Sequence, residues 1–246
     1  MRELRREVQV NHLIRTAGSA ERVSYWVQVQ PRGGLRFSAE EVRQILVAVG
    51  AMTLAFALAL VGGIAGARNL GSPAGLGILL AVSLVAVVTA FLLHELAHKV
   101  VAQRYGCFAE FRYSLMGLGI GILTAAFGFL FAMPGAVVIS GHVDARQTVR
   151  ISAAGPGTNL AIAGTTTAVA VLLGVSTFAF ADIVSVLVGT VAFVNLFLGI
   201  FNLLPFLPLD GFKIFSFNKP LWGGMLVLAV ALYFVGNSLG VFPSFF

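Results

Sequence analysis

Long uncharged stretches of apolar residues alternate with short charged segments along most of this chain. A helix needs about 20 residues to cross the apolar layer of a bilayer. Five stretches reach that length, at residues 45–67, 74–93, 151–173, 183–204 and 221–242. The pattern predicts an all-α membrane protein, a polytopic helical bundle of about five to six transmembrane helices.

A sixth apolar stretch, residues 113–141, does not fit a straight helix because it is rich in glycine and contains Pro134. Cytoplasmic loops of membrane proteins carry an excess of Lys and Arg, and basic residues flank this stretch on both sides. We therefore expect it to enter the membrane and return to the cytoplasmic side as a re-entrant loop or β-hairpin. A sixth crossing is the alternative. The flanking basic residues are Lys99, Arg104 and Arg112 before it and Arg146 and Arg150 after it.

The first 44 residues carry eight of the sixteen Lys and Arg residues and read as a small soluble segment, 1–44, ahead of a transmembrane domain, 45–246. Within the segment, SYWVQVQ and LRF flank PRGG at 31–34, a pattern typical of a β-hairpin. Ser38 and Glu41 have the spacing of a capping box, which predicts a helix that starts at about residue 39.

These segments predict a complete topology. The amino terminus lies in the cytoplasm, outer turns lie at 68–73 and 174–182, an inner loop lies at 210–220, and the carboxyl terminus lies outside. Fifteen of the sixteen basic residues then fall on the cytoplasmic side, with Arg68 as the exception. We expect an integral protein of a prokaryotic cytoplasmic membrane, with its amino terminus and active site towards the cytoplasm.

Composition excludes several classes of protein. Hydrophobic residues make up 58% of the chain and charged residues 11%, whereas soluble domains average about 25% charged residues. The net charge of +6 does not indicate a nucleic-acid partner, because most of the chain is apolar and offers no folded basic surface. A single cysteine, Cys107, excludes a disulfide framework and a thiolate cluster, which leaves His, Asp and Glu as metal ligands.

Four ionisable residues at membrane depth are the candidates for chemistry, since each costs about 2.5–3.5 kcal/mol to insert. His94 and His98 lie four residues apart, so both imidazoles share one helix face and can chelate a metal. Glu95 lies about 100° around the helix, near enough to reach a water molecule. Asp210 is the best third ligand because it ends an otherwise uncharged helix on the same membrane side as His98. The other acids are excluded by position, namely Glu3, Glu7, Glu21, Glu40 and Glu41 in the polar head, Asp182 in an outer turn, and Glu110 and Asp144 beside the re-entrant stretch.

Three asparagines and one histidine leave alternatives open. Asn159, Asn195 and Asn202 lie in apolar helices, where amides bond across helices or serve a site. Asn202 lies on the same broken segment as Asp210, and its amide could donate to an oxyanion or a substrate strand. His142 is either a further ligand or proton carrier, or an ordinary interfacial residue.

Three motifs together resemble the site-2 protease family of intramembrane zinc metalloproteases: HELAH at 94–98, GPGTN at 155–159 and NLLPFLPLDG at 202–211. The resemblance covers residues 80–215. It implies one Zn²⁺ per chain held by His94, His98 and Asp210, with Glu95 as the general base and with Asn202 and Asn159 as candidate substrate or oxyanion contacts. Phe212 stands where the family commonly has a second glycine.

The sequence therefore predicts a zinc endopeptidase that hydrolyses peptide bonds within transmembrane segments of membrane proteins. Its expected partners are such a substrate and the lipid bilayer, with a strand edge in 113–141 binding the unwound substrate. The main alternative is a metal-ion transporter or channel. A transporter is expected to show internal repeats or paired broken helices, and only one broken segment is visible. A catalytically inactive relative is the third possibility, which the presence of Glu95 argues against.

Overall fold

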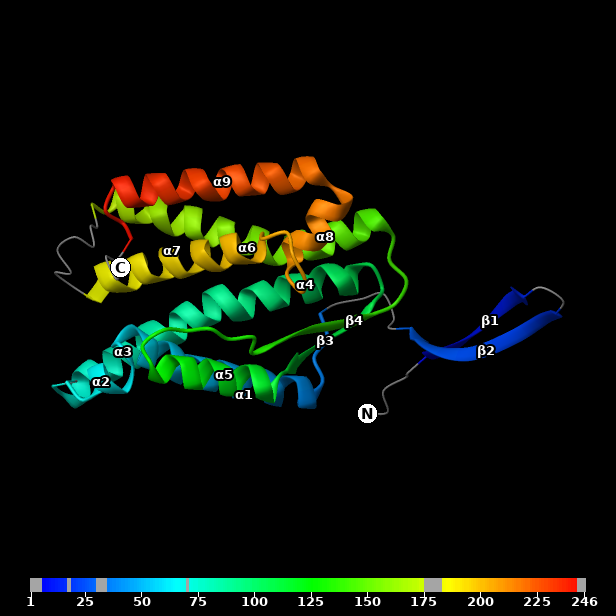
Figure 1. Cartoon of the computed structure of the whole chain (residues 1–246), viewed down its shortest axis with the longest axis horizontal. Helices are drawn as coiled ribbons and strands as arrows, with labels where there is room; N and C mark the ends of the chain where they lie inside the picture. The colour runs from blue at the N-terminus through cyan, green and yellow to red at the C-terminus, as the bar shows by residue number, and fades with distance from the viewer. Residues whose placement is uncertain (1–5, 17–18, 30–34, 70, 175–182, 243–246) are drawn as a thin grey trace.

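The chain folds into two layers of helices, with one two-stranded sheet beside the lower layer and another that projects from the bundle (Figure 1). The computed structural model describes residues 6–16, 19–29, 35–69, 71–174 and 183–242, with the backbone alone described in 6–29. In chain order the elements are β1 (Arg6–Thr16), β2 (Ser19–Val29), α1 (Ala39–Leu60), α2 (Gly63–Ala67), α3 (Pro73–Val87), η1 (Val88–Leu92), α4 (Leu93–Arg104), β3 (Phe108–Tyr113), α5 (Leu115–Ala126), β4 (Gly135–Ser140), α6 (Ala145–Leu172), α7 (Ile183–Asn202), α8 (Asp210–Phe217) and α9 (Lys219–Ser238).

The amino-terminal hairpin exists but has different strands from those predicted. β1 pairs antiparallel with β2 over their whole length, from Arg6 opposite Val29 to Thr16 opposite Ser19. Residues 35–37, predicted as a strand, have no strand structure, and the predicted turn at 31–34 lies outside the described residues. Apolar residues at alternating positions from Val8 form a strand upstream of the second one. This strand is a longer partner for the second strand than the three residues LRF.

The predicted start of the first helix is confirmed. α1 begins at Ala39, and the Ser38 side chain accepts a hydrogen bond from the backbone N–H of Glu41 at 3.1 Å. The stretch predicted at 45–67 is not one helix, however. α1 ends at Leu60, and Gly62 adopts a left-handed φ of 81° before the short helix α2.

Four described helices are long and apolar enough to span a membrane: Ala39–Leu60, Pro73–Arg104, Ile183–Asn202 and Lys219–Ser238. The second comprises α3, η1 and α4, so the stretch predicted at 74–93 continues through HELAH to Arg104. α6 contains the remaining predicted stretch, 151–173, but carries Asn159 and the threonines at 165–167, which make this helix less apolar than the other four. The composition of these helices identifies a membrane protein, while the number of crossings stays a prediction.

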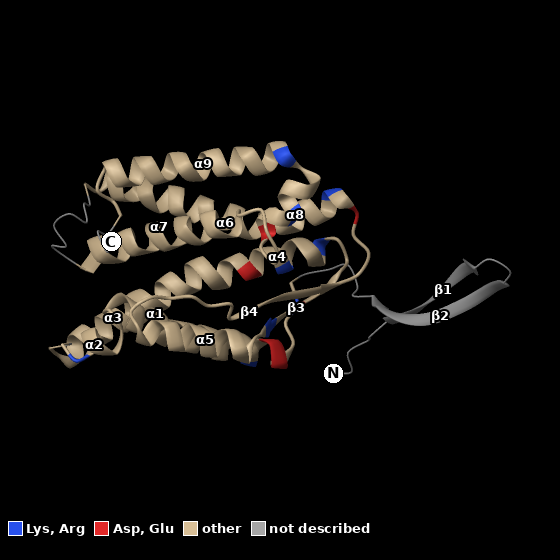
Figure 2. Cartoon of the chain, in the orientation of Figure 1, with Lys and Arg blue, Asp and Glu red and all other residues tan. Residues whose placement is uncertain are grey.

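The stretch predicted to enter and return folds as β3, α5 and β4. The two strands pair antiparallel, with Tyr113 opposite Gly135 and Phe108 opposite Ser140, and α5 is inserted between them. The chain therefore returns along the path by which it arrived, which agrees with the predicted hairpin but adds a helix of twelve residues. Lys and Arg residues of the helices gather mainly at the end of the bundle where α4 ends and α9 begins, whereas α2, which Arg68 caps, lies at the opposite end (Figure 2).

Candidate metal centre

Three donor atoms from opposite halves of the chain converge inside the bundle. His94 and His98 project from one face of α4, and their Nε2 atoms lie 3.0 Å apart. The Oδ2 atom of Asp210 lies 3.3 Å from Nε2 of His94 and 3.0 Å from Nε2 of His98. The two imidazoles are 4% and 7% exposed. The side chains that the sequence predicted as ligands are thus within 4.8 Å of one another, although the sequence separates Asp210 widely from the other two.

The chemistry and the packing of these residues fit a zinc ion. Two imidazole nitrogens and one carboxylate oxygen form a known ligand set of catalytic zinc sites, which keep a fourth position open. α6 passes close enough that Gly155 faces the site directly. A Cβ atom at Gly155 would lie 2.4 Å from Nε2 of His98 and 2.5 Å from Nε2 of His94. The glycine therefore leaves free the space that an ion held by these nitrogens needs.

Hydrogen bonds at the far side of each ring direct Nε2 toward the centre. Nδ1 of His98 lies 2.7 Å from the carbonyl oxygen of Ile151 on α6. Nδ1 of His94 lies 2.5 Å from Oδ1 of Asn159, also on α6. When each Nδ1–H donates to its acceptor, the lone pair of Nε2 is free to bind a metal, as is usual for metal-ligating histidines.

Asn159 belongs to a network of amides that joins three helical segments. Its Nδ2 donates to the carbonyl oxygen of Ala90 at 2.8 Å and to Oδ1 of Asn195 at 3.1 Å. Nδ2 of Asn195 in turn donates to Oγ1 of Thr89 at 3.1 Å. The alternative that these two amides bond across helices is therefore what the structure shows. Asn159 is fully buried and makes these bonds, which favours a role in orienting His94 over the predicted contact with substrate.

Thr89 and Ala90 lie in η1, a π-helical turn directly before HELAH. Such turns occur mostly as single bulges within helices and are frequent at functional sites. The pattern of the sequence does not predict this turn. No Gly or Pro marks it in the sequence, so its only outward sign is the polar Thr89 in an apolar run.

Glu95 lies at the boundary between α4 and the β3–β4 sheet. Its Oε2 accepts a hydrogen bond from the backbone N–H of Val137 on β4 at 2.9 Å. The contact holds the carboxylate beside the two histidines and sets the strand next to the metal centre. A carboxylate in this position can exchange a proton with a water molecule at the site.

Asp210 is positioned by the broken segment after α7. The helix ends at Asn202, the chain turns through residues 203–209, and Asp210 then begins α8. The prediction that Asp210 ends the preceding helix and opens an inner loop at 210–220 is therefore wrong. The turn packs so closely that a Cβ atom at Gly211 would lie 2.2 Å from the carbonyl oxygen of Leu203. Glycine is required there by this close approach of two backbone segments.

Two further predicted residues lie apart from the three donors. Asn202 is half-buried at the end of α7, and its Nδ2 donates to the carbonyl oxygen of Leu198 on the same helix at 3.0 Å. Its predicted contact with substrate stays a prediction. His142 follows β4 on the exposed surface and is not part of the cluster of potential metal ligands.

One buried ion pair beside the site is not predictable from the sequence pattern. Glu41, assigned to the polar head, is completely buried against Lys99, the residue that follows His98. Phe111 N–H donates to Oε1 of Glu41 at 2.9 Å, and Lys99 Nζ donates to the carbonyl oxygen of Ala109 at 3.0 Å. Together they attach β3 to α1 and α4. The available signal was a glutamate at a capping position and a lysine within an apolar helix, but no pattern connects the two.

Comparison with known proteins found relatives that share one description. "Putative zinc metalloprotease MJ0611" of Methanocaldococcus jannaschii is 36% identical over 157 residues, which cover 62% of this chain and 79% of that protein. "Putative zinc metalloprotease Rip3" of Mycobacterium tuberculosis is 39% identical over 128 residues, which cover 52% of this chain and only 28% of that protein. No family model and no solved structure matches the chain.

Proposed function

Because this chain belongs to the zinc metalloprotease family that includes MJ0611, we propose that it is an intramembrane endopeptidase of the site-2 protease type. Its substrates are transmembrane segments of membrane proteins, which it cuts at a peptide bond. The convergence of His94, His98 and Asp210 next to Glu95, among helices apolar enough to span a membrane, carries this proposal.

The location of the site favours a substrate that arrives within the membrane. Both histidines are buried, and they lie on a helix that forms part of a candidate span, Pro73–Arg104. A substrate helix in the same bilayer can approach between the helices without leaving the apolar layer. The order of HELAH, GPGTN and NLLPFLPLDG along the chain supports the same family resemblance.

The chemistry divides between the metal and Glu95. His94, His98 and Asp210 would hold a zinc ion, which when bound polarises a carbonyl and lowers the pKa of a water molecule. Glu95 takes a proton from the attacking water as the new carbon–oxygen bond forms. The same carboxyl group then gives that proton to the leaving amine as the carbon–nitrogen bond breaks. Hydrogen bonding to Val137 orients Glu95 for both transfers.

The outer edge of β4 is the proposed binding place for the unwound substrate. A helix keeps its carbonyl groups in hydrogen bonds, so the scissile segment must become extended before cleavage, and it can then add to a sheet edge. Side chains of α1 and α4 already occupy the outer edge of β3, at Ala109, Phe111 and Tyr113. Among the described residues, the only side chain bound to the outer edge of β4 is Glu95.

We further propose that the basic end of the bundle faces the cytoplasm, in a prokaryotic cytoplasmic membrane, with one Zn²⁺ per chain. The gathering of Lys and Arg at that end supports this orientation (Figure 2). No comparison supports the alternative of a metal-ion transporter, since the relatives are named as metalloproteases.

Replacement of Glu95 tests the proposal. Glu95→Gln is nearly isosteric and still accepts from Val137, but it cannot take the proton, so it should retain zinc and lose cleavage. The wild type, Glu95→Gln and the exposed control Glu40→Gln would be reconstituted in vesicles, and zinc content, zinc flux and cleavage of single-span substrates would be measured. Zinc flux without cleavage of any of a broad substrate panel would overturn the proposal. Full cleavage by Glu95→Gln would remove Glu95 as the base.

A further inference from the structure

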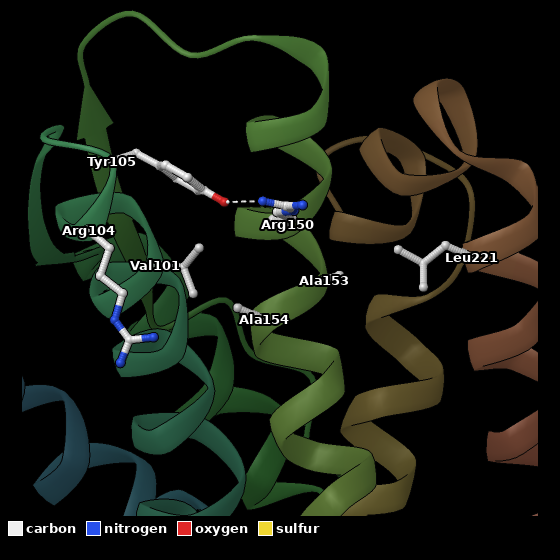
Figure 3. A pocket seen from close by; sticks show the side chains of 7 residues that line it. All are labelled: Val101, Arg104, Tyr105, Arg150, Ala153, Ala154 and Leu221. Carbon is white, nitrogen blue, oxygen red and sulfur yellow. Dashed lines mark hydrogen bonds between the residues drawn. The ribbon is translucent and has the colours of Figure 1, made fainter.

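A pocket of about 460 Å³ opens between α4, α6 and the start of α9 (Figure 3). Apolar and basic side chains both line it, and Val101 and Ala154 lie between Arg104 and Arg150 (Figure 3). Val101, Ala153, Ala154 and Leu221 form the apolar part, and Arg104, Tyr105 and Arg150 form the polar part.

The polar residues of this pocket suit an anion. Nη1 of Arg150 donates to the hydroxyl oxygen of Tyr105 at 3.2 Å, which leaves most of its N–H groups available (Figure 3). No acidic residue lines the pocket. Among the residues that the structure describes, neither Arg104 nor Arg150 forms an ion pair. Two unpaired guanidinium groups on one pocket favour a ligand with at least one negative charge.

The pocket lies where the apolar helices end. Arg104 is the last residue of the candidate span Pro73–Arg104, and Leu221 lies in the first turn of the span Lys219–Ser238. Arg150 lies near the start of α6, and α6 begins at the basic end of the bundle (Figure 2). A cavity at this level has hydrocarbon on one side and water on the other, which is the position of lipid headgroups.

We propose that this pocket binds an anionic phospholipid of the surrounding membrane, with the phosphate on Arg150 beside Tyr105, Arg104 adding positive charge at the other side of the pocket, and the glycerol and upper acyl chains against the alanines, Val101 and Leu221. Basic pockets between transmembrane helices are a known type of lipid headgroup site. The proposal requires only that the bundle lies in a membrane, so it stands apart from the proposed protease activity.

A lipid in this pocket would hold α4, which carries both histidines, against α6, which packs beside them. Val101 lies one turn after His98 on α4, and Ala154 precedes Gly155 on α6. Arg150 is followed by Ile151, whose carbonyl oxygen binds His98. Since a ligand that binds only the folded state stabilises it, occupancy of the pocket should raise the stability of the bundle.

The experiment is a lipid titration of the purified full chain in a neutral detergent. The midpoint of thermal unfolding would be measured against increasing phosphatidylglycerol, phosphatidylcholine and inorganic phosphate, and lipid retained by the protein would be identified by mass spectrometry. We expect phosphatidylglycerol to raise the midpoint at lower concentrations than phosphatidylcholine, and inorganic phosphate to have little effect.

Variants separate the pocket from general surface charge. The double variant R104Q/R150Q should weaken the apparent affinity for phosphatidylglycerol about thirtyfold, from the usual contribution of two basic residues near an anionic membrane surface. The matched control K213Q/K219Q removes two exposed charges from the same end of the bundle, outside the pocket, and should leave that affinity unchanged. If the double variant does not fold, the affinity for phosphatidylglycerol is measured in the single variant R104Q instead.

Three results would overturn the proposal. An equal loss of affinity in K213Q/K219Q would show diffuse attraction to the surface. Equal stabilisation by phosphatidylcholine would remove the preference for an anionic lipid. Equal stabilisation by inorganic phosphate would show a site for free phosphate.

Discussion

Glu41 and Lys99 form an ion pair that no solvent reaches. Both side chains are 0% exposed, and Nζ of Lys99 lies 2.7 Å from Oε1 and 2.6 Å from Oε2 of Glu41. The ring of Phe37 covers the ammonium group at 4.5 Å from its centroid. The pair connects the first turn of α1 to the helix that carries both histidines.

Removing one partner of this pair should destabilise the protein severely. Lys99→Met leaves the Glu41 carboxylate buried without a counter-charge, at an expected cost of about 3–5 kcal/mol. The double variant K99M/E41Q should recover much of that loss, because no charge remains and the amide oxygen still accepts from Phe111 N–H. Unfolding midpoints in detergent would measure both, with Glu40→Gln as the exposed control one residue away. A midpoint of Lys99→Met equal to that of the control would contradict the buried pair.

A single methyl group at Gly155 should remove metal binding. The Cβ atom of Gly155→Ala would lie within 2.5 Å of both imidazole nitrogens, so zinc content should fall sharply. The control is Gly157→Ala on the same helix, where no atom lies within 4 Å of the added Cβ. Because Ala favours helix over Gly by about 1 kcal/mol, the control should keep its zinc and be as stable as the wild type or more so. Elemental analysis of both purified variants measures their zinc content. A zinc content of Gly155→Ala equal to that of the wild type would disprove the close approach of α6.

The two asparagines should differ in what they affect. Asn159→Ala removes the acceptor of His94 Nδ1 and should weaken zinc binding about 10–100-fold, as for other groups that orient metal ligands. Asn159→Asp restores an acceptor oxygen and should regain part of the affinity. Asn202→Ala should keep the zinc affinity and reduce the cleavage rate. Competition with a chelator gives the affinities, and an equal loss of zinc in Asn202→Ala would show that both residues support the metal.

The return of β4 along β3 predicts that both flanks of this segment lie on one side of the membrane. Cysteines introduced at Arg104 and His142, both exposed, should react with an impermeant thiol reagent from the same side in a Cys107→Ala background. A cysteine at the exposed Arg68 should react from the other side. Labelling of Arg104 and His142 positions from opposite sides would instead establish a further crossing.

The sequence predicts those parts of the site that depend on local spacing or on a residue type that is rare in the chain. The separation of His94 from His98 fixes their common face on any α-helix. Asp210 could be selected because few acids occur in so apolar a chain, and the structure does bring it to both histidines. The start of α1 follows from Ser38 because the capping contact is local.

The remaining parts depend on contacts between distant segments. Glu41 has the position of a capping-box residue, but its side chain turns inward because Lys99 and Phe111 approach from elsewhere in the chain. Asn159 reads equally well as a substrate contact or a bond between helices until the packing of α6 against α4 is known. The turn at 31–34 is a plausible hairpin turn, yet β2 pairs with the strand before it.

The wide separation of Asp210 from HELAH has a consequence for the order of synthesis. A ribosome makes α4 well before α8, so a nascent protein carries two imidazoles long before it carries the carboxylate. Since affinity for zinc depends on the full set of ligands and on the folded bundle that holds them, the growing chain would acquire its metal only after α8 has been made. Incomplete chains would then be inert toward their neighbours in the membrane.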